Sequence, residues 1–222
     1  MNSAQLAAWR SQLRKTLIER RARLAADQRE DLRRRIDIHL QRAFPDLAQG
    51  VIGFCWPYRN EYDARHLLAS LRRQGALTAL PVVVAPKTPL EFREWHPGVK
   101  MQEGVLGIPF PVGTELLQPD TFLIPLVGFD TRGYRLGYGG AYFDRTLAAL
   151  DRPARKVGVG YEMLWVETIH PQAHDVPMDY VVTERGLYRR EGEVLRFLEE
   201  PIAFSSPPCY AAEIGNQPRN SR

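Results

Sequence analysis

Apolar residues recur along the chain in blocks whose spacing alternates between that of helices and that of strands. The first block, Ser3 to Phe44, places leucine and isoleucine at broken helical spacing among many arginines, and it predicts one helix that ends at Pro45. Later blocks are short apolar runs bounded by polar or glycine-containing stretches, as is typical of strands. The predicted strands are Val51 to Trp56, Leu77 to Ala85, Thr121 to Phe129, Lys156 to Tyr161 and Asp179 to Thr183.

Two further helices are predicted between these strands, from Ala64 to Gln74 with a cap at Gly75, and from Tyr142 to Leu150. The stretch from Pro86 to Pro111 is expected to be irregular, with a short extended piece around Leu90 to Trp95. Because strands and helices alternate, the sequence predicts an α/β fold, a three-layer αβα sandwich with a mainly parallel central sheet.

Ligands of such sheets bind outside the carboxyl ends of the strands. The loops that follow Trp56 and Phe129 are therefore the predicted site. Residues 1–200 are expected to form a single domain, and residues 201–222, which include a Ser-Ser-Pro-Pro run, a disordered tail.

Composition narrows the class of protein. With 222 residues and 44% hydrophobic content the chain can fill its own core, and we expect a monomer. The net charge of +4 suits phosphorylated or carboxylated ligands and is weak evidence for nucleic acid. No run approaches the roughly 18 apolar residues of a membrane span, so we expect a soluble, cytoplasmic protein without a membrane partner. Cys55 and Cys209 lack His or Cys neighbours at metal spacing, which argues against zinc or a disulfide.

The strongest local signal is the segment from Arg135 to Asp144, which contains three glycines and joins a predicted strand to a predicted helix. Such a loop lets backbone N–H groups approach phosphate oxygens at a helix N-terminus. A tight turn without a ligand would explain the glycines equally well. The segment matches neither GxxxxGK[ST] nor GxGxxG, so a nucleotide would need a different kind of site.

Residues 129–145 read FDTRGYRLGYGGAYFDR, which resembles the motif FD..G.RLGYGGGYYDR of the 5-formyltetrahydrofolate cyclo-ligases. The resemblance extends to about Glu184 through a basic first helix, a glutamate after the first strand, a GIxEP-like turn and a late HD…D..VTE segment. It implies an ATP- and Mg²⁺-dependent cyclisation of 5-formyltetrahydrofolate to 5,10-methenyltetrahydrofolate, with release of ADP and phosphate. In that reaction the formyl oxygen is phosphorylated, and the second folate amine then attacks.

The resemblance also implies site residues. ATP would be bound by Arg10, Arg14, Arg135, Leu136, Gly137, Tyr138, Gly139, Gly140, Ala141, Tyr142 and Phe143. The folate would be bound by Trp56, Glu61, Tyr138, Gly139, Gly140, Ala141 and Tyr142. Mg²⁺ would be held by Asp144 and Asp175, and the catalytic clamps would be Arg14, Arg135 and Tyr142. No Ser, Cys or His nucleophile is implied.

The chemistry of these residue types fits their implied roles. Carboxylate oxygens suit Mg²⁺, a glutamate can accept hydrogen bonds from the N–H groups of a pterin, and Arg10 and Arg14 share one face of a helix. Taken alone, Asp144 would be an acid favoured by the dipole of its helix, Glu61 a loop charge and Trp56 a core aromatic.

Five other arginines in the first block are interpreted as a solvated helix face: Arg20, Arg21, Arg33, Arg34 and Arg35. The chain departs from the family pattern at Ala141, at Phe143 and at Phe110, which replaces a common glutamate. These departures keep open a catalytically weak paralogue that acts as a folate- or nucleotide-binding regulator. An RNA-associated protein is a further, much less favoured alternative, because no RNA-recognition motif is present.

Restoring the motif glycine at Ala141 is a test of these departures. If the loop holds a conformation open to alanine, Ala141→Gly is expected to cost about 0.4 to 1 kcal/mol of stability and to leave turnover almost unchanged.

Overall fold

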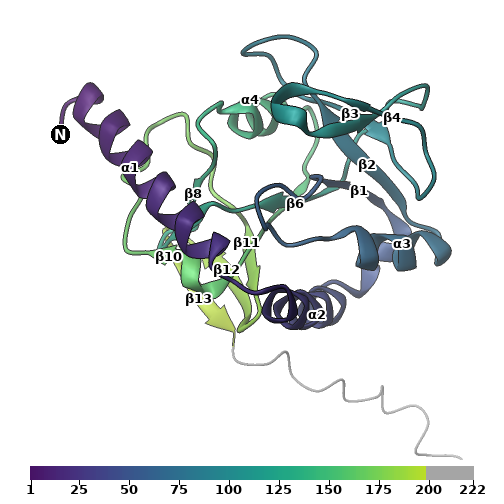
Figure 1. Cartoon of the computed structure of the whole chain (residues 1–222), viewed down its shortest axis with the longest axis horizontal. Coiled ribbons are helices and arrows are strands. Elements are labelled where there is room, and N and C mark those ends of the chain that lie inside the picture. The colour runs from purple at the N-terminus through teal and green to yellow at the C-terminus, as the bar shows by residue number, and fades with distance from the viewer. Residues whose placement is uncertain (199–222) are drawn as a thin grey trace, which may run out of the picture.

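An eight-stranded sheet forms the centre of the computed structural model, which describes residues 1–198 (Figure 1). The strand order is β13-β12-β11-β9-β6-β1-β2-β3, and the five strands from β11 to β2 are parallel. The outer strands β3, β12 and β13 are antiparallel to their neighbours. The strands are β1 Val51–Phe54, β2 Leu77–Val82, β3 Glu91–Glu94, β6 Thr121–Pro125, β9 Arg155–Val159, β11 Tyr180–Thr183, β12 Gly186–Glu191 and β13 Val194–Leu198.

The central strands are apolar because both faces of the sheet are covered. Ile52, Leu123 and Val157, one from each of three neighbouring strands, are at most 1% exposed. Such continuous apolar runs are typical of parallel sheets between helix layers. The core therefore lies along the middle of the sheet.

Helices cover both sides of this sheet, which confirms the predicted three-layer α/β fold. Helices α2 and α3 lie on one side and α4 on the other (Figure 1). Helix α3 buries Leu67, Leu68 and Leu71, and it ends before Gly75, whose φ of 116° confirms the predicted cap. The helices are α1 Ser3–Ala22, α2 Ala26–Ala43, α3 Arg65–Arg73 and α4 Tyr142–Ala148, with 3-10 turns η1 Pro45–Gln49, η2 Val105–Gly107 and η3 Glu162–Leu164.

Two small sheets flank the large one. One has the order β10-β7-β8 and the other pairs β4 with β5. Their bounds are β10 Trp165–Val166, β7 Gly128–Asp130, β8 Arg135–Leu136, β4 Met101–Glu103 and β5 Pro109–Pro111. The predicted extended piece near Leu90 is confirmed as β3, whereas β4, β5, β8, β10, β12 and β13 were not predicted.

The prediction of one helix from Ser3 to Phe44 is wrong, because the chain turns between α1 and α2. Ala25 is extended, with φ −67° and ψ 162°, and its N–H donates to Oε1 of Gln28 at 3.0 Å. The turn lets α2 bury Ile36 and Leu40 while α1 buries Leu17. No glycine or proline marks this turn, so its position is not evident from local sequence.

The predicted strand from Thr121 to Phe129 is likewise two strands. Pro125 ends β6, since proline has no N–H to donate to the ladder. The chain then leaves the large sheet, and Gly128 pairs with Leu136 in the small sheet. The predicted loop that follows Phe129 thus contains β8.

The expected tail at 201–222 lies outside the described residues, and the domain boundary at 200 stays a prediction. Within residues 1–198, no helix is long and apolar enough to cross a membrane.

Candidate active site

A cavity of about 800 Å³ opens at the carboxyl ends of β1, β2 and β6, where the sequence predicted a site. The glycine-rich loop, the start of α1 and the β4–β5 hairpin complete its wall. Its volume is in the range of small-molecule sites. All of the predicted site residues line it: Arg10, Arg14, Trp56, Glu61, Arg135, Leu136, Gly137, Tyr138, Gly139, Gly140, Ala141, Tyr142, Phe143, Asp144 and Asp175.

The glycine-rich loop is held against α1. Nε of Arg14 donates to the carbonyl oxygen of Gly137 at 2.6 Å. Gly139 has a φ of 96°, and a Cβ there would lie 3.4 Å from Nη2 of Arg14. A Cβ on Gly140 would lie only 2.8 Å from the ring of Tyr142. The positive φ favours glycine at position 139, and the close approach to the Tyr142 ring favours it at position 140.

Three arginines make one end of the cavity positive. Nη2 of Arg10 contacts Asp175 at 2.6 Å, and Nη2 of Arg135 contacts Asp144 at 2.8 Å. Arg14 has no carboxylate partner among the described residues, and burial together with the charge of Arg10 lowers its pKa. Guanidinium groups remain charged even so. This end of the cavity is therefore suited to an anion with several oxygens, such as a polyphosphate.

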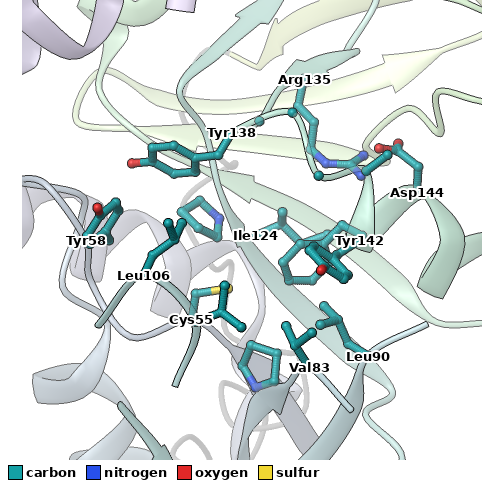
Figure 2. A pocket seen from close by; sticks show the side chains of 18 of the residues that line it. Cys55, Tyr58, Val83, Leu90, Leu106, Ile124, Arg135, Tyr138, Tyr142 and Asp144 are labelled. Carbon is teal, nitrogen blue, oxygen red and sulfur yellow. The ribbon is translucent and has the colours of Figure 1, made fainter. Parts of the chain in front are cut away.

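A buried carboxylate occupies the opposite end of the cavity. Glu61 is 7% exposed, and its Oε1 accepts from the hydroxyl of Tyr138 at 3.0 Å. Its Oε2 accepts from the backbone N–H of Tyr58 at 3.1 Å. Burial raises the pKa of Glu61, and the positive charge of Arg21 opposes that rise. Figure 2 shows Tyr58 and Tyr138 together, on the other side of the cavity from Asp144.

Apolar side chains separate the two ends. Ile124 and Tyr142 lie between the tyrosine pair and Asp144, and Cys55 and Leu90 line the cavity below them in the view (Figure 2). Cys55 is half-buried, and burial raises the pKa of its thiol well above its usual value, which disfavours the reactive thiolate. Flat, apolar walls of this kind suit an aromatic ring system.

The predicted folate contact Trp56 carries a cation on its face, because the guanidinium of Arg65 lies 4.2 Å from the centroid of its indole ring. One face of Trp56 is thus occupied by a cation–π contact.

The two predicted metal ligands differ in how many of their carboxylate oxygens already accept hydrogen bonds from protein groups. Oδ1 of Asp144 accepts from Arg135 and from the N–H of Val176, and within the described residues its Oδ2 accepts no hydrogen bond. Both oxygens of Asp175 contact Arg10. In residues 1–198 no group of three or more His, Cys, Asp or Glu side chains could hold a metal ion. Mg²⁺ commonly uses one or two carboxylates with water and substrate phosphates, and Asp144 fits that role.

Comparison with known proteins shows the family of the chain. A sequence model of the 5-formyltetrahydrofolate cyclo-ligase family matches residues 6–184. The chain belongs to this family.

Relatives in this family cover most of the chain. The 5-formyltetrahydrofolate cyclo-ligase of Haemophilus influenzae is 29% identical over 176 residues, which are 76% of this chain and 94% of the relative. The Escherichia coli K12 enzyme of the same name is 27% identical over 172 residues, 74% of this chain and 94% of the relative. The NMR structure of Aquifex aeolicus 5,10-methenyltetrahydrofolate synthetase matches with a TM-score of 0.72 and 30% identity, over 86% of this chain and 96% of that one.

The departures from the cyclo-ligase motif lie in the cavity wall. Ala141 is left-handed, with φ 51° and ψ 27°, a conformation that L-residues avoid, so the condition under which Ala141→Gly was expected to cost stability is not met. Phe110 lines the cavity from β5, where the family pattern has a glutamate. Phe143 packs near Phe92, with ring centroids 6.5 Å apart.

The interpretation of the five other arginines as a solvated face is wrong for Arg21, which is 1% exposed. Its side chain donates to the carbonyl oxygens of Arg59 and Leu126 at 2.9 and 3.1 Å, and to the Tyr138 hydroxyl at 2.7 Å. Arg33 is half-buried and bonds to acids of its own helix, whereas Arg20, Arg34 and Arg35 are exposed. Sequence reasoning also missed Tyr58, whose ring packs 5.5 Å from that of Tyr138.

Proposed function

We propose that this chain catalyses the ATP- and Mg²⁺-dependent cyclisation of 5-formyltetrahydrofolate to 5,10-methenyltetrahydrofolate, with release of ADP and phosphate. The observation that supports the proposal is the difference in charge between the two ends of one cavity. Arg14 and Arg135 stand at one end, Glu61 is buried at the other, and an apolar wall lies between them. Triphosphate and pterin have the complementary charges and hydrogen-bonding groups.

The proposal assigns a binding role to each end of the cavity. Arg14 and Arg135 bind phosphate oxygens, and the backbone of the glycine-rich loop follows the phosphate chain. The carboxylate of Glu61 accepts hydrogen bonds from the pterin's N–H groups, and this contact orients the formyl oxygen toward the γ-phosphate. Tyr142, in the wall between them, closes against the reacting groups.

The reaction needs no covalent bond to the protein. The formyl oxygen attacks the γ-phosphorus and ADP leaves. The second folate amine then attacks the formyl carbon, its proton passes to solvent, and the carbon–oxygen bond breaks as phosphate departs. Arginine charges stabilise the phosphoryl group in transfer, so positioning and electrostatics supply the rate enhancement.

Asp144 would hold the magnesium ion, with Asp175 as a second ligand if Arg10 releases one of its oxygens. The ion would neutralise charge on the phosphates and leave the arginines to orient them. Before substrate arrives, the pair between Arg135 and Asp144 keeps both charges compensated inside the wall.

Formation of methenyltetrahydrofolate tests the proposal directly. Purified protein is incubated with 5-formyltetrahydrofolate, ATP and Mg²⁺; product is followed by its absorbance, and ADP by a coupled assay. One ADP per methenyl product, with none formed when any of the three is omitted, is the expected result. Absence of product from a folded protein would refute the assigned reaction.

A second candidate function is a folate- or nucleotide-binding regulator without turnover. Phe110 favours it, because an apolar ring stands in the cavity wall where the family pattern has a carboxylate. Calorimetric binding of 5-formyltetrahydrofolate and ATP without product would select this alternative.

A further inference from the structure

Arg21 is the largest of the fully buried side chains, and it belongs to none of the groups that bind the substrates in the proposed function. It reaches from α1 into the wall behind Glu61. Its guanidinium donates to carbonyl oxygens of two separate loops, at Arg59 after β1 and at Leu126 after β6. A buried guanidinium with this many acceptors is fixed in place.

The direction of the hydrogen bonds defines what Arg21 does to its neighbours. Nη2 of Arg21 donates to the Tyr138 hydroxyl at 2.7 Å, and an arginine can only donate. The single proton of Tyr138 is therefore left for Glu61, whose Oε1 accepts it at 3.0 Å. The other carboxylate oxygen accepts from the backbone N–H of Tyr58. Both oxygens of Glu61 are thus set as acceptors.

Charge acts in the same direction as the hydrogen bonds. Nη2 of Arg21 lies 3.7 Å from Oε1 of Glu61, and the side chains are 1% and 3% exposed. Burial alone favours the neutral carboxyl group, while a nearby guanidinium favours the carboxylate. Removal of that cation would raise the pKa of Glu61 further and favour the protonated form, in which one of its oxygens is a donor.

We infer that Arg21 is a positioning residue that keeps Glu61 a hydrogen-bond acceptor toward the cavity, with Tyr138 as the link. The inference rests on the proposed function, in which Glu61 receives N–H donors of the folate. It gives the arginine no contact with substrate. Arg21 also connects Tyr138 of the glycine-rich loop to α1. At about 3.6 residues per turn it stands two turns beyond Arg14, which contacts Gly137 from the same helix face.

The test compares Arg21→Gln and Arg21→Lys with Glu61→Gln and with the double variant Arg21→Gln/Glu61→Gln. Arg23→Gln, an exposed arginine at the end of the same helix, is the matched control. Steady-state KM values for 5-formyltetrahydrofolate and for ATP are measured from pH 6 to 9, roughly the range in which a raised carboxyl pKa would show. Thermal unfolding confirms that each variant is folded.

We expect Arg21→Gln to raise KM for the folate at least about tenfold at pH 7 and KM for ATP less than about threefold. Because Glu61 ionises again at higher pH, the folate KM of Arg21→Gln falls as pH rises, and this fall lies at higher pH than any fall in the parent protein. Arg21→Lys shifts the profile back toward that of the parent in part. The double variant binds folate no worse than Glu61→Gln, since Arg21 acts through that carboxylate.

Three results would overturn the inference: a folded Arg21→Gln protein with the parent's folate KM, a folate KM that is raised equally at every pH, or independent effects in the double variant. If Arg21→Gln does not fold, Arg21→Lys and Tyr138→Phe carry the same comparison. Failure of the proposed function is a separate outcome, because the parent protein then makes no product. In that case folate dissociation constants from calorimetry replace KM, with the same expected pattern.

Discussion

Ala141 stands one residue before α4 in the glycine-rich loop, in a backbone conformation that L-residues avoid. Its φ of 51° and ψ of 27° lie in the left-handed region. For an L-residue that region costs roughly 1–2 kcal/mol, because Cβ approaches the following carbonyl oxygen. Ala141→Gly removes this cost and adds the flexibility of glycine to the unfolded chain, which opposes it by about 0.4–1 kcal/mol.

The difference between these two terms spans about 0–1.6 kcal/mol, and its middle predicts that Ala141→Gly stabilises the protein by about 0.8 kcal/mol. For a domain of this size the midpoint of thermal unfolding then rises by roughly 1–4 °C. A matched control is Ala8→Gly, on an exposed position inside α1, where the same chemical change should destabilise by about 1 kcal/mol. Opposite shifts in the two variants are the expected result, in thermal and in urea unfolding.

Turnover of Ala141→Gly should change less than about tenfold, because Gly139 and Gly140 already allow the close approach of the loop backbone to its neighbours. A lower midpoint for Ala141→Gly, equal to that of Ala8→Gly, would refute the argument from backbone strain. A gain of more than about tenfold in turnover, with unchanged stability, would show that the methyl group obstructs a ligand instead.

Three other changes address the site. Asp144→Asn should lower turnover at least about tenfold without unfolding, because an amide is a poor Mg²⁺ ligand but still accepts from Arg135; an unaltered response to a Mg²⁺ titration would exclude the metal role. Arg14→Gln should raise KM for ATP about tenfold, and the control Lys15→Gln should leave it unchanged. Equal effects of the two variants would show that Arg14 contributes only surface charge and no specific contact with phosphate. In a Cys209→Ser chain, Cys55 should react with iodoacetamide at pH 8 at least about tenfold more slowly than a free cysteine, since burial raises its pKa; rapid alkylation would contradict that burial.

Local signals in the sequence predicted the parts of the site that depend on local conformation. Glycines at 137, 139 and 140 follow one another within a few residues, so a loop with unusual backbone freedom is visible in the sequence alone. The position of the cavity at the carboxyl ends of β1 and β6 follows from the alternation of strands and helices. What the sequence could not give is which long-range contacts each side chain makes.

The fold shows the same limit. Strands in the parallel core were predicted because burial on both faces makes each one a continuous apolar run. The hairpin of β12 and β13 was missed, since arginine and glutamate interrupt its apolar pattern on the outer part of the sheet. The turn between α1 and α2 was missed because the Gln28 cap is one polar residue among many in that helix.

Arg21 shows how a charge run can hide a buried residue. Arg10, Arg14, Leu17 and Arg21 are spaced i, i+4, i+7 and i+11, and at about 3.6 residues per turn all four fall on one narrow face of α1. Leu17 is 1% exposed, so that face is turned toward the protein and its arginines are drawn into the site. Arg20 and Arg23 lie off this face and are exposed. Composition alone does not distinguish the buried arginines from the exposed ones. Their angular position around the helix relative to Leu17 does. This angular position explains why Arg21 reaches Tyr138, whereas Arg20 and Arg23 do not.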